Sequence, residues 1–531
     1  MRVKLNTPSN APHSTIYLFS CKPGNAVFRI LKRHNECEVT LGDLKKVDRL
    51  LSFANPAAKY DPRYSLGLWD GRVHLLSGAK FPTGLLPYAV KRLERDGFTV
   101  DVVDKAQKRP LKPIPPDFIK VNGPAGPSPL RPDQVWAINK MLAAGSGGGW
   151  IATGWGKGAG IAAILGAIYF QTGGKSLVLV PRIGLLSQTS RDLAEMLDGV
   201  SVGMIGNGKR EFDADVVVAT AQTLQKVLDT AKSPKHREDI QRLTAMLESR
   251  TALMLDEAHK VSSGRNWYKI AKMCPAPYRF AVSGTLLSGK PHEDMYLRGI
   301  VGRVVVKITA KSMWERGNLA KPVIYMVTDR GAYDGRDTPY STLDYADAVT
   351  TCLVNDVRYN RSIVHIARHL LDLGKAPMIF TRFIQHIRNL SRMMGRAGLP
   401  HEILYGKHDV AHREAIKARY MRDGDFVMLV STIFDEGENV NNLPALIMAG
   451  GGKGDNNAIK QRIGRGMRVK EGDNRVMVFD FAHHHCRMLA RHASERKRMY
   501  REQGMEVVDI PNVFSLNQYP FTASIEDRKA E

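Results

Sequence analysis

A glycine-rich segment that ends in a lysine is the first feature of this sequence that could do chemistry. Residues 152–158 read ATGWGKG. A glycine-rich turn before a helix lets backbone N–H groups surround phosphates, and a lysine after it reaches the outer phosphates. We expect Thr153, Gly154, Gly156, Lys157 and Gly158 to form such a loop. Taken alone, the segment also fits a flexible glycine-rich turn without a ligand.

The last position of this loop departs from the usual pattern. A nucleotide-binding loop of this kind ends in Gly-Lys-Ser/Thr, and its hydroxyl binds Mg²⁺. This chain has Gly158 there, and Ile151 stands where the first glycine is usual. Because Mg²⁺ commonly keeps several waters, a water can replace the hydroxyl. We therefore expect a weakened ATPase, and a protein that binds but hydrolyses little is the competing hypothesis.

Two adjacent carboxylates supply the second part of a phosphoryl-transfer site. The apolar run Leu253–Leu255 is followed at once by Asp256, Glu257, Ala258 and His259. One carboxylate can hold Mg²⁺, through water in the case of Asp256, while its neighbour orients and deprotonates the attacking water. A chance acidic helix cap is the alternative, and the phosphate loop upstream makes it the weaker one.

Alternating strand and helix patterns must position these residues. After residue 130, short apolar runs typical of buried parallel strands lie between helical stretches. They are residues 177–180, 216–219, 252–256 and 279–284, then residues 377–381, 426–432, 445–450 and 476–481. Two such series predict two tandem α/β domains, each with a parallel sheet.

The remaining segments set the domain boundaries. Residues 105–129 contain KRPLKPIPP and NGPAGPSP, which predicts a Pro-rich extended linker. Short β-like runs and one helical pattern predict a small α+β domain over residues 1–104. We place the α/β domains at residues 130–320 and 321–502, and we expect residues 503–531 to be a polar, loose C-terminal tail.

With both parts of the site in view, the chain resembles a superfamily 2 helicase. Motifs of that family occur here in the expected order between residues 130 and 478. Besides the phosphate loop they are Leu130–Gln134, Val180–Arg182, Thr220–Thr223, Asp256–His259, Ser283–Thr285, Ile379–Arg382, Ser431–Gly437 and Gln461–Arg468. The resemblance implies two RecA-like domains, ATP and Mg²⁺ as cofactors, and a nucleic-acid strand as the track.

The same resemblance implies a role for each motif residue. Nucleotide contacts would come from Arg131, Gln134 and Gly437, with Gln134 reading adenine. Strand contacts would come from Arg182, Thr220, Thr223, Thr381, Arg382 and Thr432. Coupling between the ATP state and the strand would come from His259, Ser283 and Thr285. The arginine-finger motif QxxGRxxR is matched by Gln461, Arg465 and Arg468. The alternative to these functional roles is that the arginines are solvated surface charges and that the Ser, Thr and Gln side chains only cap helices.

The N-terminal region resembles phage UvsW-type helicases, which remodel forks, junctions, D-loops and R-loops. The segments that carry this resemblance are Tyr60–Arg63, Leu68–Val73 and Gly84–Leu86. It implies 3′-to-5′ movement and a DNA contact at Trp69 and Arg72, where a ring that can stack on a base lies beside a phosphate-binding cation. The alternative is that Trp69 belongs to a core and the charges nearby are solvated.

Composition narrows the class of partner. Lys and Arg number 77 against 53 Asp and Glu, a formal net charge of +24, which favours a polyanion such as nucleic acid. The longest apolar-rich stretch, Ile161–Phe170, is about half the length that spanning a membrane needs. Five scattered cysteines without metal-ligand spacing fit a reducing compartment. We expect a monomer in the cytoplasm, without membrane association, and in the bacterial host's cytoplasm if a phage encodes the chain.

Three functional hypotheses follow. The first is an ATP-dependent DNA helicase that unwinds or remodels branched DNA, with RNA as an alternative track. The second is a nucleic-acid-binding clamp whose ATPase is weak or absent because of Gly158. The third is the motor subunit of a restriction system, which is disfavoured because the sequence has no convincing PD-(D/E)xK nuclease constellation.

Overall fold

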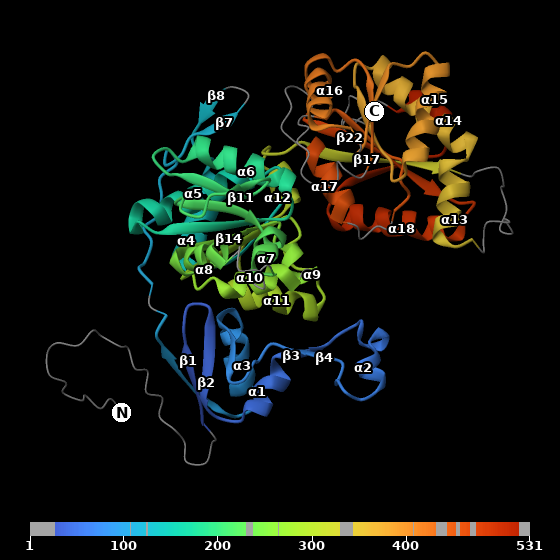
Figure 1. Ribbon diagram of the computed structural model, residues 1–531. Helices are drawn as coiled ribbons and strands as arrows, with labels where there is room; N and C mark the ends of the chain where they lie inside the picture. The colour runs from blue at the N-terminus through green and yellow to red at the C-terminus, as the bar shows by residue number, and fades with distance from the viewer. Residues whose placement is uncertain are drawn as a thin grey trace, which may run out of the picture. The chain divides into compact units, whose positions relative to one another are not determined.

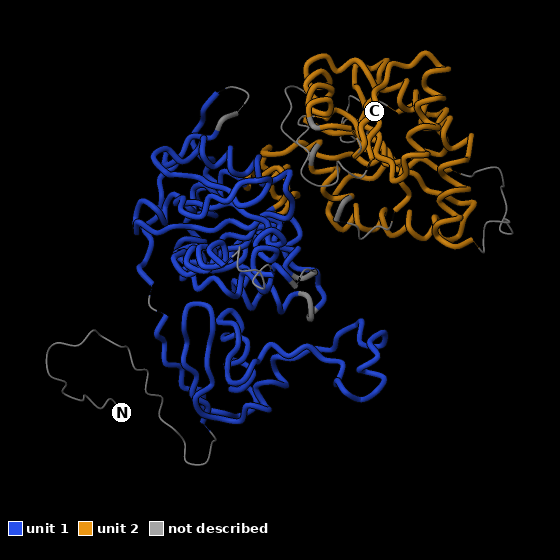
Figure 2. The backbone as a smooth tube through the Cα atoms, in the orientation of Figure 1, with its two compact units in different colours: residues 1–151, 158–307 blue, residues 152–157, 308–531 orange. Residues whose placement is uncertain are grey.

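The computed structural model describes residues 27–106, 108–123, 126–229, 237–263, 265–329, 343–406, 408–431, 443–452, 457–467 and 474–519. The chain divides into two compact units, residues 1–151 with 158–307 and residues 152–157 with 308–531 (Figure 2). Unit 1 holds a small N-terminal domain and the first parallel sheet, and unit 2 holds the second (Figure 1). Within the described ranges, no helix has the length and hydropathy that crossing a bilayer requires.

The N-terminal domain is a four-stranded sheet packed against two helices. Its strand order is β5-β2-β1-β6, with β1 parallel to β6 and antiparallel to β2. The elements are β1 (Val27–Lys32), β2 (Glu36–Leu41), α1 (Leu44–Leu50), β5 (Lys80–Pro82), α3 (Leu86–Arg95) and β6 (Thr99–Asp104). Leu86, Ala89 and Leu93 share one face of α3 at helical spacing, and all three are buried in a core with Phe28 and Phe81.

A narrow arm projects from this domain (Figure 1). Its stem is the antiparallel pair β3 (Ser52–Ala54) and β4 (Arg72–His74), and its tip holds a 3-10 turn (Ala58–Tyr60) and helix α2 (Pro62–Ser65). We call residues 52–74 the arm and residues 55–71 its tip. Asp61 caps α2 by accepting a hydrogen bond from Arg63 N at 3.0 Å, and Pro62 occupies the first helical position, where an N–H would have no helical partner.

The N-terminal domain packs directly against helix α11 (Pro291–Val301), which belongs to the first parallel-sheet domain. Gly84 lies so close to α11 that a Cβ on it would be 2.0 Å from the carbonyl oxygen of Arg298. Phe53 of the arm stands edge-on to Tyr296 of α11, with ring centroids 5.3 Å apart. Only glycine fits at position 84, and the N-terminal domain and α11 therefore form one packed body.

The Pro-rich linker lies along the first parallel-sheet domain. Residues 108–120 form no helix or strand, and the hairpin β7 (Val121–Gly123) and β8 (Gly126–Ser128) follows them. Lys108 Nζ donates to the carbonyl oxygens of Gly145 and Pro277, each at 3.0 Å, and burial lowers the pKa of Lys108 to about 8. Leu111 and Ile114 are buried. The linker is thus attached along its length.

The first sheet has eight strands in the order β12-β11-β13-β10-β14-β15-β9-β16. The strands from β11 to β9 are parallel, and β12 pairs with β11 as an antiparallel hairpin. The strands are β9 (Ser146–Ile151), β10 (Lys175–Val180), β11 (Val202–Gly206), β12 (Lys209–Arg210), β13 (Val216–Thr220), β14 (Arg250–Asp256), β15 (Tyr278–Ser283) and β16 (Val304–Ile308). The helices are α4 (Pro132–Ala144), α5 (Lys157–Thr172), α6 (Ile183–Met196), α7 (Ala221–Asp229), α8 (Arg237–Ser249), α9 (His259–Ser263), α10 (Arg265–Met273) and α11, and α12 (Ala310–Trp314) follows β16 in the part of the chain that belongs to unit 2.

The second sheet has seven strands in the order β19-β20-β18-β21-β22-β17-β23, and all neighbours are parallel. The strands are β17 (Lys321–Asp329), β18 (Pro377–Phe380), β19 (His401–Leu404), β20 (Val427–Val430), β21 (Ala445–Met448), β22 (Arg475–His483) and β23 (Glu506–Ile510). The helices are α13 (Tyr345–Val349), a π-helical turn (Thr350–Val354), α14 (Val357–Asp372), α15 (Ile384–Arg396), α16 (Val410–Asp423), α17 (Asn457–Gly466), α18 (Arg487–Glu502) and a 3-10 helix (Val513–Gln518). The predicted fold class, two tandem RecA-like α/β domains after a small α+β domain, is confirmed.

The expectation of a loose tail from residue 503 is wrong for its first part. β23 adds to the second sheet beside β17, and the 3-10 helix follows it. Ile510, Val513 and Leu516 are buried in the core of unit 2. In the sequence these apolar residues alternate only weakly with charged ones, so the pattern did not indicate a strand or a helix there.

A buried ion pair joins β22 to α18. Arg496 donates to both carboxylate oxygens of Asp480, at 2.7 and 2.9 Å, and to the carbonyl of Gly452 at 2.6 Å. Tyr500 Oη donates to the same carboxylate at 2.7 Å. Both charged side chains are almost fully buried, at 2% and 0% exposure. Because each remaining polar atom finds a partner, the pair tolerates burial.

Replacing Arg496 with Leu should destabilise this part of unit 2 by about 3–5 kcal/mol, because Asp480 would remain buried without its cation. Native-state hydrogen exchange of the β22 amides measures the loss. Arg498→Leu is the matched control, since Arg498 lies on the same helix with its side chain 74% exposed. Equal protection of β22 in both variants would contradict the role given to the pair.

Candidate nucleotide and nucleic-acid site

The carboxyl ends of three adjacent strands bring the predicted catalytic segments to one edge of the first sheet. In the parallel register Asp256 of β14 is paired with Val282 of β15, and Ser283 of β15 with Trp150 of β9. Trp150 Nε1 donates to the carbonyl of Gly284 at 2.9 Å, which ties the end of β9 to the segment after β15. This is the edge at which open α/β sheets bind ligands.

The phosphate loop leaves this edge directly after β9. Gly154 and Gly156 have φ angles of +89° and +92°, which side chains other than glycine rarely adopt. α5 then begins at Lys157 and is buried along most of its length. The loop therefore ends at the amino end of a fixed helix, where backbone N–H groups without helical partners favour a phosphate.

Gly158 has room for the hydroxyl side chain that the usual pattern places there. A Cβ built on Gly158 meets no other atom within 4 Å, and the residue is exposed in the first turn of α5. Its φ angle lies outside the positive range that strains other residues. Packing and backbone conformation thus permit Ser or Thr at this position.

The acidic motif forms a hydrogen-bonded group with the segment after β15. Ser283 Oγ donates to Glu257 Oε2 at 3.2 Å and accepts from Thr285 N at 3.2 Å. His259 Nδ1 lies 3.0 Å from Ser283 Oγ and 3.4 Å from Glu257 Oε2. The structure thus brings together Glu257 and the three predicted coupling residues. Ser283 is fully buried, so it links the carboxylate to the following backbone without solvent between them.

The backbone at the acidic motif is held in a conformation that aims the second carboxylate. Glu257 has a φ angle of +47°, unusual for a residue other than glycine. Its N–H donates to Asp256 Oδ1 at 2.8 Å, and Ala258 N donates to the carbonyl of Val282 at 3.2 Å. These two bonds turn the chain sharply after β14. Strain of this kind is characteristic of functional sites.

Arg131 and Gln134 lie at the start of α4, where they form a helix cap. Gln134 Oε1 accepts from Arg131 N at 2.9 Å, and Arg131 Nε lies 3.1 Å from Asp133 Oδ1. Gln134 is 3% exposed. The structure thus shows the helix-capping role that the sequence allowed as an alternative, and the nucleotide contacts of these two residues remain a prediction.

The residues of the first parallel-sheet domain that were predicted to contact a nucleic-acid strand differ in their exposure to solvent. Arg182 is exposed at the start of α6. Thr220 is 3% exposed, and its Oγ1 accepts from Thr223 N at 3.2 Å and lies 2.9 Å from Thr223 Oγ1. Thr220 therefore begins α7 as a cap, and Arg182 and Thr223 offer the more accessible groups.

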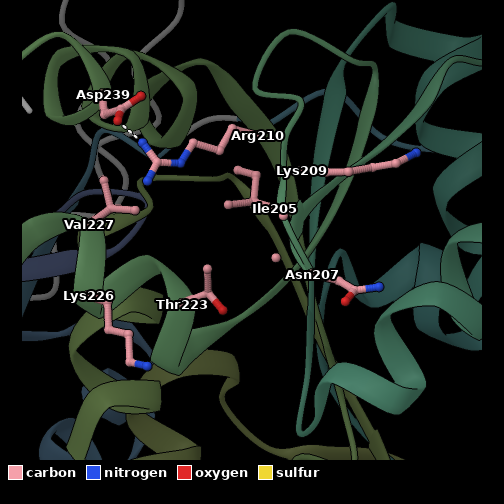
Figure 3. A pocket seen from close by; sticks show the side chains of 10 residues that line it. Ile205, Asn207, Lys209, Arg210, Thr223, Lys226, Val227 and Asp239 are labelled. Carbon is pink, nitrogen blue, oxygen red and sulfur yellow. Dashed lines mark hydrogen bonds and ion pairs between the residues drawn. The ribbon is translucent and has the colours of Figure 1, made fainter.

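A pocket of about 360 Å³ opens beside Thr223, between the β11–β12 hairpin and α7 (Figure 3). We call it the hairpin pocket. Its lining residues are Ile205, Gly206, Asn207, Gly208, Lys209, Arg210, Thr223, Lys226, Val227 and Asp239. Arg210 is hydrogen-bonded to Asp239, and Lys226 is exposed on α7. This pocket was not predicted from the sequence, although an Asn-Gly turn followed by Lys-Arg is a visible signal for a basic hairpin.

In unit 2 the residues after β18 split into one buried and one exposed group. Thr381 is fully buried and its Oγ1 donates to the carbonyl of Phe383 at 3.4 Å, so its side chain serves the turn. Arg382 is exposed, and its guanidinium donates to Tyr345 Oη at 3.0 Å. Arg382 is therefore the residue of this motif that a strand can reach.

The arginine motif lies on α17 and beyond it. Gln461 is half-buried, and the neighbouring Arg462 is 8% exposed with its guanidinium over the ring of Phe380 at 5.2 Å. Arg465 also lies on α17, and its side chain is outside the described part of the chain. The remaining predicted residues outside the described ranges are Thr432, Gly437 and Arg468.

Trp69 and Arg72 have partners inside the arm. Trp69 Nε1 donates to the carbonyl of Arg72 at 2.8 Å. The Arg72 guanidinium donates to Ser52 Oγ at 3.0 Å and to the Ser52 carbonyl at 2.9 Å, which joins β4 to β3. The alternative reading of Trp69 as a packing residue fits these contacts better than a direct DNA contact.

Known proteins are similar to this chain over the segments that contain these motifs. Residues 128–288 match the family described as type III restriction enzyme, res subunit, and residues 362–470 match the helicase conserved C-terminal domain. The chain is 22% identical over 450 residues to the ATP-dependent DNA helicase UvsW of Enterobacteria phage T4, which covers 81% of this chain and 84% of the relative. It is 23% identical over 345 residues to the "Probable helicase D10" of Escherichia phage T5, covering 64% and 69%.

A solved structure supports the fold alone. S. cerevisiae Dbp5, in a substituted form bound to RNA and ADP BeF3, has a TM-score of 0.50 at 14% identity and covers 73% of this chain and 95% of its own. The order of the motifs, the two family matches and the phage relatives agree: this chain resembles superfamily 2 helicases and is similar to phage UvsW.

Proposed function

We propose that the chain is an ATP-driven motor that unwinds or remodels branched DNA, with 3′-to-5′ movement. The observation that carries this proposal is the group formed by Glu257, Ser283 and His259 at the carboxyl edge of the first sheet, next to the phosphate loop in strand order. The Glu257 carboxylate is hydrogen-bonded to Ser283, the first residue of the predicted coupling segment Ser283–Thr285. A movement of this carboxylate with the state of the nucleotide can therefore be transmitted to that segment. The proposal extends to the substrate through the similarity to UvsW, whose name identifies it as a DNA helicase.

The residues at this edge fit ATP and Mg²⁺. The two positive-φ glycines and the start of α5 suit phosphates, and Asp256 at the end of β14 suits a metal-bound water. When bound, Mg²⁺ neutralises charge on the β- and γ-phosphates. Lys157 would bind the same phosphates, and Glu257 would accept a proton from the attacking water at its carboxylate. Arg465 and Arg468 would stabilise the charge that develops on the transferred phosphoryl group.

The hairpin pocket is proposed to bind a backbone phosphate of the DNA strand. It lies beside Thr223, and Lys226 and the hairpin contribute cations around it. Phosphate contacts of this kind position a strand without reading its sequence. Arg182 and Arg382 would extend the same backbone contact along the track.

A clamp with weak or absent ATPase is the second candidate, and Gly158 is the observation that favours it. Without a hydroxyl at this position, one protein ligand of Mg²⁺ is missing and only water can take its place. The retention of Lys157, Asp256 and Glu257 favours the motor.

Replacing Lys157 with Ala should abolish ATP turnover, because the outer phosphates would lose their cation, and should leave DNA binding largely intact. Steady-state ATPase with Mg²⁺, measured alone and with single-stranded, duplex and forked DNA, tests this beside a binding titration. Unchanged turnover in Lys157→Ala would refute the assignment of the phosphate loop.

Replacing Gly158 with Thr should raise ATP turnover by about tenfold to a hundredfold, since a hydrogen-bond or ligand contact to a charged group is worth roughly 1.5–3 kcal/mol. The Mg²⁺ concentration for half-maximal activity should fall as well. Gly395→Thr is the control, because Gly395 is an exposed helical glycine whose Cβ would also meet nothing within 4 Å. No turnover in the natural chain or in Gly158→Thr, with DNA binding intact, would establish the clamp.

Replacing Lys226 with Ala should weaken DNA binding for all sequences alike and reduce the slope of log K against log salt by about one. Lys175→Ala is the control, because Lys175 begins β10 at the opposite edge of the same sheet. Fluorescence-anisotropy titrations at several salt concentrations measure both slopes. An equal change of the slope in the two variants would show that the hairpin pocket does not contact the DNA.

A further inference from the structure

The tip of the arm exposes several large apolar side chains. Tyr60, Leu66 and Leu68 are 78%, 70% and 75% exposed. They lie within nine positions of one another, at the end of the arm that points away from the sheet of the N-terminal domain (Figure 1). Single exposed apolar residues are ordinary, whereas a group of this kind marks a contact surface.

The tip has a defined structure that holds these side chains outward. Leu66 N donates to the carbonyl of Pro62 at 3.0 Å, and Leu68 N donates to the carbonyl of Arg63 at 2.8 Å. Tyr64 and Trp69 meet edge to face with centroids 6.5 Å apart, and the Arg63 guanidinium lies 5.6 Å from the Trp69 ring centre. This contact fixes the position of Trp69, which is half-buried, while Tyr64 remains 47% exposed beside the three more exposed apolar side chains.

The tip carries no net charge, which separates it from a phosphate-binding surface. Residues 55–71 contain two cations and two anions, namely Lys59, Arg63, Asp61 and Asp70. Arg63 is paired with Asp61 at 2.7 Å, and Arg72 at the stem is held by Ser52. In a chain with a formal charge of +24, an uncharged apolar surface suits the faces of bases better than the sugar-phosphate backbone.

The stem fixes the arm to the ATP-dependent part of unit 1. Phe53 of β3 packs against Tyr296 of α11, and Tyr296 also packs against Tyr268 of α10 with centroids 4.9 Å apart. α11 begins shortly after the segment Ser283–Thr285, and Asp294 of α11 accepts from Ser288 N at 2.8 Å. The loop after the coupling residues is thus bonded to the helix on which the arm rests.

We infer that the tip is the strand-separating wedge of this motor, with Tyr60, Leu66 and Leu68 packed on the exposed face of the last base pair at a branch point. The inference rests on the proposed function and names the surface that performs its strand-separation step. Side chains with large apolar surfaces replace the stacking that a base pair loses when its neighbour opens. The fixed stem lets motion of unit 1 press the tip against the duplex.

The test uses the full chain with Tyr60→Ser, Leu66→Ser and Leu68→Ser combined. Single-stranded-DNA affinity and single-stranded-DNA-stimulated ATPase should stay within about twofold of the natural chain, because these are exposed positions away from the phosphate loop. Unwinding of forked DNA should fall about tenfold or more, as expected for lost stacking on a base. The matched control is Leu41→Ser, Leu44→Ser and Tyr88→Ser, three apolar residues of the same domain with exposures of 52%, 40% and 47%.

A binding readout independent of ATP separates this inference from the proposed function. A fork with 2-aminopurine in its last base pair should change fluorescence on binding the natural chain and the control, and should not change on binding the tip variant. If the natural chain shows no DNA-stimulated ATPase, the motor proposal fails, and the 2-aminopurine signal still decides the wedge. Normal fork unwinding or an unchanged 2-aminopurine response in the tip variant overturns the wedge. A change in the sedimentation of the free protein would assign the tip to a protein contact and would also overturn it.

Discussion

The common direction of the strands is the constraint on which the rest of the molecule depends. In a parallel sheet every strand ends at the same edge, so residues distant in sequence meet there. Trp150, Asp256 and Ser283 become neighbours because β9, β14 and β15 are adjacent and parallel. Parallel strands also need crossover connections, whose helices cover the sheet and bury it. The buried faces account for the apolar strand sequences, and the shared edge accounts for the placement of polar residues directly after them.

The hydroxyl of Ser283 connects the polar groups at that edge by hydrogen bonds. A serine hydroxyl has one proton to donate and two lone pairs that accept. Here the proton goes to Glu257, and Thr285 N and His259 occupy the accepting side. A change in the position of the Glu257 carboxylate therefore alters the bonding of the segment that follows β15. The two side chains are close because the sheet register pairs Asp256 with Val282, the residues directly before Glu257 and Ser283.

Long apolar runs made the two parallel sheets predictable, while contacts formed across the chain did not follow from local patterns. Residues 177–180 and 216–219 lie on β10 and β13, as continuous apolar sequences predict. The sequence around Gln134 is compatible with both a nucleotide contact and a helix cap, and only the bond to Arg131 N reveals the cap. Likewise, the internal partners of Arg72 and the packing of Ile510 depend on elements that a linear pattern does not place.

The attachment of the linker defines which piece of the chain can be prepared as a fragment. Proteases cleave segments whose backbone can leave the protein surface, and Pro-rich connections between domains are usual sites. Here Lys108 holds the carbonyls of Gly145 and Pro277, and Ile114 N donates to Asn139 Oδ1 at 2.8 Å. A fragment that began at residue 130 would lose these bonds and uncover the apolar surface beneath the linker. An intact form of the first parallel-sheet domain therefore keeps the linker from about residue 105, and it also keeps the N-terminal domain, which packs on α11.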